Sequence, residues 1–236
     1  MKPVKAKTRT ALSYSRSGVG DDRGSSLSDK AYRQMEELIV TLRLEPGKIL
    51  SEAALATRLK IGRTPIREAL QRLAREGLVL ILPRRGILVS EINVKTQLRL
   101  LEVRREIERL MARTAAIRAT AAERGQFQAI AEGMTKAAAG ADDILFMRLD
   151  RELNLLVAQA SRNEFASKSM GLMHGLSRRF WYLHYKEVAD LPLAARLHAD
   201  VARVIAKGDA AKAAAASDKL LNYVEDCTRA AIDTDQ

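Results

Sequence analysis

The apolar residues recur with a helical period along nearly the whole chain, and one β-type segment, residues 78–89, interrupts this pattern. The segment has two short runs of leucine, isoleucine and valine, separated by the turn residues 83–86 (Pro-Arg-Arg-Gly). Two such runs around a glycine-containing turn predict a β-hairpin. Helical patterns precede the hairpin, and only helical patterns follow it from Val94 onward. We therefore expect a mainly α fold with one small hairpin.

The positive charge of the chain is concentrated near its N-terminus. Residues 1–90 carry eighteen Lys and Arg against nine Asp and Glu, which is +9 of the formal net charge of +11 over 236 residues. A basic front part followed by a nearly neutral remainder predicts a module that binds a polyanion and a second domain with another task. An ordinary solvated basic surface is the alternative explanation.

Several classes of protein are disfavoured by the composition. Cys227 is the only cysteine, so an intrachain disulfide and a cysteine-based zinc cluster are excluded, and we expect Cys227 to fill space in an apolar helical stripe. No apolar run reaches transmembrane length, and the N-terminus lacks the apolar segment of a signal peptide. We expect a cytoplasmic protein without a membrane partner.

Three regions are expected along the chain. Residues 1–26 are rich in Lys, Arg, Ser and Gly, which predicts a disordered basic arm that either reaches a DNA groove or remains a tail. Residues 27–90 have the order of a winged helix-turn-helix, with helices at 28–44, 51–59 and 64–76 before the hairpin. Residues 91–236 should form an all-α bundle of six helices. Breaks are expected near residues 119, 140, 162, 190 and 208, and a linker at 87–95.

The third helix has the pattern of a recognition helix in the DNA major groove. A helical wheel places an apolar set on one face, namely Ile66, Ala69, Leu70 and Leu73. A separate face gathers Thr64, Arg67 and Gln71, with Arg63 at its edge. Arginine can bond guanine, glutamine can bond adenine, and a threonine at a helix start can hold phosphate. A solvated helix with i,i+4 ion pairs explains this face less well, because Arg67 and Gln71 face away from Glu68 and Arg72.

The tip of the predicted hairpin suits a DNA-contacting wing. Arg84 and Arg85 supply two cations, and Gly86 permits close approach to the DNA backbone or minor groove. The candidate DNA-binding residues are therefore Arg63, Thr64, Arg67, Gln71, Arg84, Arg85 and Gly86.

The first domain resembles the GntR superfamily of bacterial regulators. The resemblance rests on Leu44-Glu45-Pro46-Gly47, Leu50-Ser51-Glu52, Leu55-Ala56, Gly62-Arg63-Thr64-Pro65-Ile66-Arg67-Glu68-Ala69-Leu70, Leu73, Glu76-Gly77-Leu78-Val79 and Arg85-Gly86. It implies that Arg63 and Arg67 contact base edges, that Thr64 contacts phosphate and that Gly86 lies at the wing tip.

Two departures from the GntR pattern affect the reading of DNA. The turn reads Leu59-Lys60-Ile61-Gly62 instead of the usual Leu-Gly-Val-Ser, so Gly62 lacks the family's small hydroxyl contact. Ala53 stands where some members place another DNA-contacting arginine. The operator sequence therefore does not follow from the resemblance.

The second domain resembles the FadR-type C-terminal (FCD) domain, in its shorter VanR-like group with six helices. The resemblance rests on Glu102-Val103-Arg104 with Glu108, on Asp150 followed by Asn163, and on His198 followed by Gly208-Asp209. It implies a small-molecule effector and a homodimer.

Several polar side chains lie within or beside the apolar stripes of this domain, and they support an effector site. Asp150 and Asn154 share an apolar helix face, His198 leads another stripe, and Arg104 borders a third. Buried polar groups are costly unless something satisfies them. One explanation is a pocket for an anionic metabolite such as an organic acid, bound by Arg104, Asp150, Asn154 and His198. The alternative is a closed network, such as an Asp150–His198 or Asp150–Arg104 pair, without a ligand.

A second polar stripe lies on the helical pattern 163–187. It contains His174, Arg178, Trp181 and Tyr185, opposite Phe165, Leu172, Leu176 and Phe180. A helix with two such faces packs on both sides, and we expect packing against a neighbouring helix or protomer in preference to ligand stacking.

Many FCD domains hold a divalent metal with one Asp and three His, and this sequence departs from that pattern. Asp150 and His198 are retained, but Asn154 and Leu220 stand at the other two positions, and Asn222 faces away from the stripe. One carboxylate, one imidazole and one amide bind zinc-like ions weakly. We therefore expect no tightly bound metal or other cofactor.

These features favour an effector-responsive transcriptional regulator that binds a palindromic operator as a dimer, usually as a repressor in this superfamily. An architectural DNA-binding protein without an effector is the alternative. An enzyme is disfavoured, because the three histidines are scattered and neither a His-Glu-x-x-His motif nor a nucleophile elbow is present.

Overall fold

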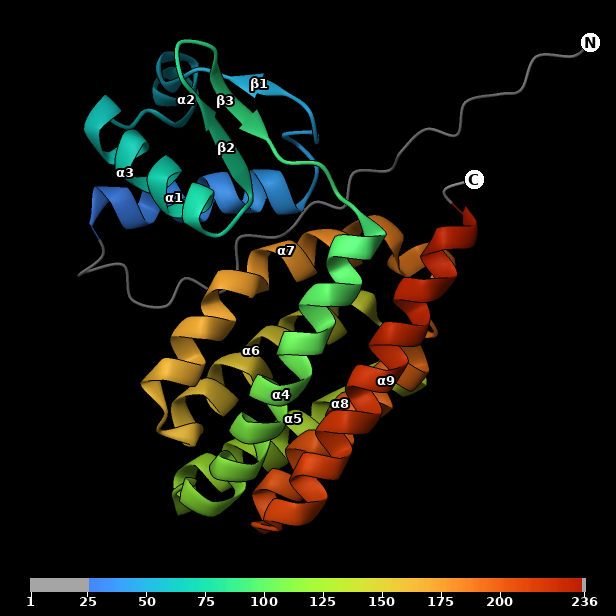
Figure 1. Ribbon diagram of the computed structural model, residues 1–236. Helices are drawn as coiled ribbons and strands as arrows, with labels where there is room; N and C mark the ends of the chain where they lie inside the picture. The colour runs from blue at the N-terminus through green and yellow to red at the C-terminus, as the bar shows by residue number, and fades with distance from the viewer. Residues whose placement is uncertain (1–25, 235–236) are drawn as a thin grey trace, which may run out of the picture.

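The computed structural model describes residues 26–234, which form a small mixed unit placed on a larger helical bundle (Figure 1). Residues 1–25 of the predicted arm lie outside the described residues. The expectation of a mainly α fold with a small hairpin is confirmed. No helix among residues 26–234 is long and apolar enough to cross a membrane.

The N-terminal unit contains three helices and three short strands. They are α1 (Leu27–Val40), β1 (Ile49–Leu50), α2 (Glu52–Leu59), α3 (Arg63–Arg75), β2 (Val79–Leu82) and β3 (Gly86–Val89). Ser51 caps α2 by accepting a bond from the Ala54 N–H, as its hydroxyl and position predict. Gly77 adopts a left-handed backbone (φ +73°) just after α3, as expected for a glycine that ends a helix.

The predicted bounds of the first helix were wrong at both ends. The helix begins at Leu27, before the predicted residue 28, because Ser26 is the N-cap and forms a reciprocal capping box with Asp29. The helix ends at Val40 instead of residue 44, because Leu42 turns into the left-handed region (φ +57°) and the Leu44 N–H bonds the Leu38 carbonyl. Leu44 is nevertheless buried, so its apolar character reflects the core and not a longer helix.

The three strands form an antiparallel sheet in the order β1-β3-β2. β2 and β3 make the predicted hairpin, with Val79 opposite Val89 and Leu82 opposite Gly86. β1 was not predicted, since two residues carry no periodicity. It forms because Ile49 and Leu50 pair with Leu88 and Ile87.

The C-terminal bundle contains the six predicted helices. They are α4 (Val94–Arg118), α5 (Ala121–Gly140), α6 (Asp143–Ser161), α7 (Glu164–Val188), α8 (Leu191–Lys207) and α9 (Ala210–Thr234). The linker was predicted too long: β3 extends to Val89 and α4 begins at Val94, so only residues 90–93 connect the two parts. The side chain of Asn93 caps α4 at once, which shortens the connection.

Each part has its own apolar core. In the N-terminal unit, the apolar face of α3 packs against α1, β2 and β3, so the predicted burial of Ile66, Leu70 and Leu73 is confirmed. In the bundle, α5 lies against α8 and α4 against α9, and Phe127 is fully buried between them. Cys227 is also buried, as expected.

Helix α7 is the element that joins the two parts (Figure 1). Leu176 packs against the core of the N-terminal unit, and Gly175 allows this approach, since a Cβ there would lie 2.7 Å from the Leu78 Cδ1. Arg179 is buried and donates to the carbonyl oxygens of Ser90 (2.7 Å) and Glu91 (3.1 Å). The N-terminal unit is therefore held on α7 by apolar packing and by hydrogen bonds to the connecting segment.

Replacing two glycines by alanine should have opposite effects on stability. Gly86 has φ +105°, and a Cβ there would lie 2.8 Å from the Leu50 carbonyl oxygen. Gly86→Ala should therefore destabilise the N-terminal unit by about 1–3 kcal/mol. Gly125 lies inside α5 with open space around it, so Gly125→Ala should stabilise the bundle by about 0.5–1 kcal/mol.

Amide hydrogen exchange of the strands and fluorescence of Trp181, the single tryptophan, report on the two parts separately during urea unfolding. Unchanged exchange protection of β1 and β3 in Gly86→Ala would contradict the close contact between Gly86 and β1.

Candidate DNA interface and ligand cavity

The predicted reading face of α3 is exposed to solvent. Arg63, Thr64, Arg67 and Gln71 are all exposed, while the opposite face is buried. Gly62 caps α3 without a side-chain hydrogen bond, so the first N–H groups of this helix keep no side-chain acceptor. An open helix N-terminus of this kind favours an anion such as a DNA phosphate.

Arg67 has a partner that the sequence did not reveal. Its Nε lies 3.0 Å and its Nη2 lies 2.8 Å from the carboxylate oxygens of Glu52 on α2. Helical spacing within α3 does not indicate this ion pair, because Glu52 lies fifteen positions away on another helix. The pair uses one edge of the guanidinium and leaves Nη1 directed elsewhere, so Arg67 is held in one orientation while it remains 62% exposed.

The hairpin tip presents its cations to solvent. Arg84 has a left-handed backbone (φ +61°), and the side chains of Arg84 and Arg85 are exposed. Within residues 26–234 neither side chain forms an ion pair. Gly86 begins β3 directly after them, at the place where the resemblance puts the wing tip.

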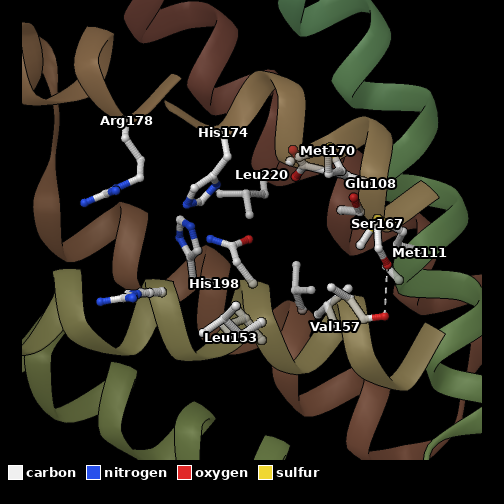
Figure 2. Close-up of a pocket in the computed structure, with 18 of the residues that line it drawn as sticks. Glu108, Met111, Leu153, Val157, Ser167, Met170, His174, Arg178, His198 and Leu220 are labelled. Carbon is white, nitrogen blue, oxygen red and sulfur yellow. Dashed lines mark hydrogen bonds between the residues drawn. The ribbon is translucent and has the colours of Figure 1, made fainter. Parts of the chain in front are cut away.

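A cavity of about 350 Å³ lies between the bundle and α1 of the N-terminal unit. Figure 2 shows His174 of α7 and His198 of α8 pointing toward each other, with Leu153 and Val157 beyond them, and Arg178 also lines the cavity from α7. A smaller chamber of about 100 Å³ shares Asn154, His174, Arg178 and His198 with the larger one. A mostly apolar cavity of this size with a few converging polar groups fits a small molecule.

All four predicted effector residues line the smaller chamber, and three of them contact one another directly. The Asp150 carboxylate lies 3.1 Å from the His198 Nε2, and the Asn154 amide donates to the same Asp150 oxygen at 3.0 Å. The alternative of an Asp150–His198 pair is therefore present, and it forms part of the wall of a cavity. Arg104 lines the smaller chamber, where its Nε donates to Glu108 at 2.6 Å, so its charge is already matched.

The surroundings of His198 favour its protonated form. Its Nδ1 lies 2.7 Å from the Ala194 carbonyl oxygen, which can only accept, so Nδ1 carries a hydrogen. Its Nε2 faces the Asp150 carboxylate, which also accepts. Burial alone would lower the pKa of His198, but the hydrogen bond and charge of Asp150 outweigh it and raise that pKa. Burial likewise opposes ionisation of Asp150, and His198 reverses this, so the pKa of Asp150 is lowered.

His174 and Arg178 are site residues that the sequence analysis did not select. Both belong to the polar stripe that was assigned to packing, and both line the two chambers. Burial and the nearby charge of Arg178 lower the pKa of His174 to about 4, so His174 is neutral at pH 7. Further along the stripe, Trp181 packs against the bundle core and Tyr185 bonds Asp143 on α6, as the packing assignment expects, but Trp181 also lines the smaller chamber. On the opposite face Leu176 and Phe180 pack inward, but Phe165 and Leu172 are exposed.

The residues present do not fit the metal site of other FCD domains. Leu220 is a cavity-wall side chain without a donor atom, and Asn154 uses its amide N–H on Asp150. His198 has both ring nitrogens engaged as donors. Among residues 26–234, no group of three or more His, Cys, Asp or Glu side chains is placed to hold a metal ion.

Family models match both parts of the chain. The FCD domain model matches residues 99–223, and the model described as bacterial regulatory proteins, gntR family, matches residues 27–89. The HTH-type transcriptional repressor RspR of Escherichia coli (strain K12) is 27% identical over 183 residues, which cover 78% of this chain and 80% of that protein. The Nta operon transcriptional regulator of Aminobacter aminovorans is 27% identical over 170 residues, 72% of this chain and 79% of that protein.

Solved structures share the fold. E. coli McbR/YncC superposes with a TM-score of 0.70 at 18% identity, covering 89% of this chain and 97% of that one. A transcriptional regulator GntR from Rhodococcus sp. RHA1 superposes with a TM-score of 0.60 at 17% identity, covering 89% of this chain and 99% of that one.

Loss of the Asp150–His198 ion pair should have a pH-dependent effect. The lowered pKa of Asp150 contributes stability above its ordinary value of 3.8, which is lost as the pH falls through the lowered value. The raised pKa of His198 contributes stability below its ordinary value of 6.5, which is lost as the pH rises through the raised value. Asp150→Asn should therefore lower Tm most at pH 5–6 and progressively less toward pH 9.

Thermal melting of both proteins across this range measures the difference. Asp200→Asn on the same helix as His198 is the matched control, since Asp200 is exposed and pairs with Arg203 instead of a histidine. A Tm difference for Asp150→Asn that stays constant from pH 5 to 9 would show that His198 is not charged.

Proposed function

Since the chain belongs to the GntR family of bacterial regulatory proteins and carries an FCD domain, we propose that it is an effector-responsive repressor of transcription. The observation that carries this proposal is one chain with an exposed recognition helix and a cavity lined by residues of both parts. RspR is named as a transcriptional repressor, which supports repression as the effect on transcription. The protein acts in the cytoplasm and has no catalytic activity of its own.

Operator DNA is read by α3 and the hairpin. Arg63 and Arg67 contact base edges, Thr64 contacts phosphate at the open start of α3, and Gln71 extends the reading face. Glu52 supports this role by holding Arg67 in one orientation. Arg84, Arg85 and Gly86 form the wing that lies on the DNA backbone.

The protein binds a palindromic operator as a homodimer. One reading head offers few base contacts, and a two-fold axis doubles them. Exposed apolar side chains on bundle helices support such an assembly: Val103 (51% exposed) and Ile117 (63%) on α4, and Phe165 (73%) and Leu172 (51%) on α7.

The effector is a small anionic metabolite, of the class of organic acids, bound in the connected chambers. The proposed contacts are Arg104, Asp150, Asn154 and His198, to which the cavity wall adds His174 and Arg178. The imidazolium of His198 and the guanidinium groups favour an anion, and the apolar wall accepts a short carbon skeleton. Binding changes the operator affinity by biasing the placement of the reading heads.

Two arginine variants distinguish base recognition from backbone contact. Arg67→Ala should weaken binding to the operator, selected from random DNA, by about 1–3 kcal/mol and relax its base preference, because a bidentate base contact is lost. Arg84→Ala should weaken all sequences alike and reduce the salt dependence of binding, because a phosphate contact is lost. Arg196→Ala, which removes an exposed charge from α8, is the control and should change neither property.

Footprinting of the same complexes tests the assembly, because a dimer protects two half-sites related by two-fold symmetry. Uniform coverage without a discrete site would indicate an architectural DNA-binding protein. An unchanged footprint and affinity for Arg67→Ala would contradict the assignment of α3 as the recognition helix.

We further propose that no metal ion is tightly bound, because the donor set lacks the imidazoles that zinc-like ions favour. Elemental analysis of protein purified without chelator or affinity tag should find zinc, nickel and manganese far below one equivalent per chain. Near-stoichiometric metal that is lost in Asp150→Ala would overturn this proposal.

A further inference from the structure

Arg178 connects the cavity to the DNA-reading unit. It lines both chambers from α7, and its Nη1 lies 3.0 Å from the Glu36 Oε1 on α1. Its Nη2 lies 3.6 Å from the Glu37 Oε2. The same side chain therefore lines the ligand space and forms ion pairs that hold α1 on α7.

The carboxylate of Glu36 is poorly accommodated where it lies. Its side chain is only 15% exposed, and burial raises its pKa. Arg178 counteracts that effect, while the neighbouring charges of Glu76 and Glu37 add to it. A half-buried carboxylate near two others depends on its cation, so the Arg178–Glu36 pair is closely balanced and open to competition.

A second cation borders the same space. Arg151 on α6 lines the larger chamber, is exposed, and within residues 26–234 forms no hydrogen bond or ion pair. Its charge reaches Glu36 and His174, which places it near Arg178. Arg72, in contrast, is occupied, since it stacks on the Tyr32 ring at 3.6 Å and pairs with Glu76. Arg178 and Arg151 are thus two cations that line the larger chamber, which Arg33 on α1 also lines.

We propose that a carboxylate of the effector binds Arg178, with Arg151 as a second contact, and displaces Glu36. This inference rests on the proposed effector function and identifies the ion pair through which the effector would change DNA binding. Loss of the Arg178–Glu36 pair releases α1 from α7. The contacts of Arg179 with residues 90–91 lie outside the chambers and persist, so the reading unit pivots on α7 without detaching. A dimer whose DNA-reading units pivot freely binds the two operator half-sites with lower affinity.

Reciprocity makes this switch testable without knowledge of the natural effector. If a carboxylate and Glu36 compete for Arg178, removing the charge of Glu36 must strengthen carboxylate binding and mimic the bound state. Glu36→Gln should bind the acid about tenfold more tightly than wild type, within the roughly 5–150-fold range of such couplings. Without any acid, Glu36→Gln should bind the operator more weakly than wild type does.

The probes are acetate, succinate, glutarate, adipate and benzoate, each beside its carboxamide. Calorimetric titration at pH 8 uses the full chain as wild type, Glu36→Gln, Arg178→Gln and Glu152→Gln. Glu152 is the matched control, since it lies on α6 outside both chambers and pairs with Arg148. We expect at least one acid, and not its amide, to bind wild type. Arg178→Gln should weaken that binding at least tenfold, and Glu152→Gln should leave it unchanged.

Three results would overturn the inference. They are an absence of binding by every acid to both wild type and Glu36→Gln, equal binding to Arg178→Gln, and no gain in affinity for Glu36→Gln. The gain in Glu36→Gln cannot arise from misfolding, so it separates competition from a structural defect. If the protein selects an operator and releases it only with a neutral compound, the proposed function stands and this inference fails. If no operator is selected, the proposed function fails whatever the acids do.

Discussion

The packing of α7 on both of its faces is the constraint on which the arrangement of the molecule depends. Leu176 enters the core of the N-terminal unit, while His174, two residues before it, lines the cavity. Residues two apart on a helix point in nearly opposite directions, so one helix can serve both neighbours. Gly175 lets Leu78 approach closely. One helix therefore contacts both the cavity and the DNA-reading unit.

Two neighbouring arginines of α7, Arg178 and Arg179, differ in the partners that balance their charges. Arg179 is 2% exposed and bonds backbone carbonyl oxygens instead of a carboxylate, and burial lowers its pKa to about 10. It remains a cation at neutral pH and fixes the short connection between the two parts. Arg178 has carboxylate partners, but they belong to the other unit and lie beside a cavity. The contacts of Arg179 therefore suit a permanent connection between the two parts. Those of Arg178 suit a connection that a ligand can break.

In the cavity wall, a hydrogen-bond network occupies the place where the resemblance to FCD domains puts a metal. Asp150, Asn154 and His198 satisfy one another around the retained carboxylate, while Leu220 adds apolar surface. Asp150 raises the pKa of His198, which favours a positive charge on the imidazole at this place. In the DNA-reading unit, the Glu52–Arg67 pair has an analogous role, since it orients a cation before any ligand arrives.

The sequence by itself determined the elements: the six bundle helices, the hairpin, the buried face of α3 and its exposed reading face. Those features depend on spacing within one element and on local caps such as Ser51 and Gly77. Only the tertiary structure decided that β1 pairs with β3, that Glu52 holds Arg67, and that Arg178 meets Glu36 across 142 positions. It also showed that the polar stripe on α7, for which packing against a neighbouring helix was expected, lines the cavity with His174 and Arg178. Contacts between elements depend on how helices pack in space, and periodicity along the chain carries no record of that packing.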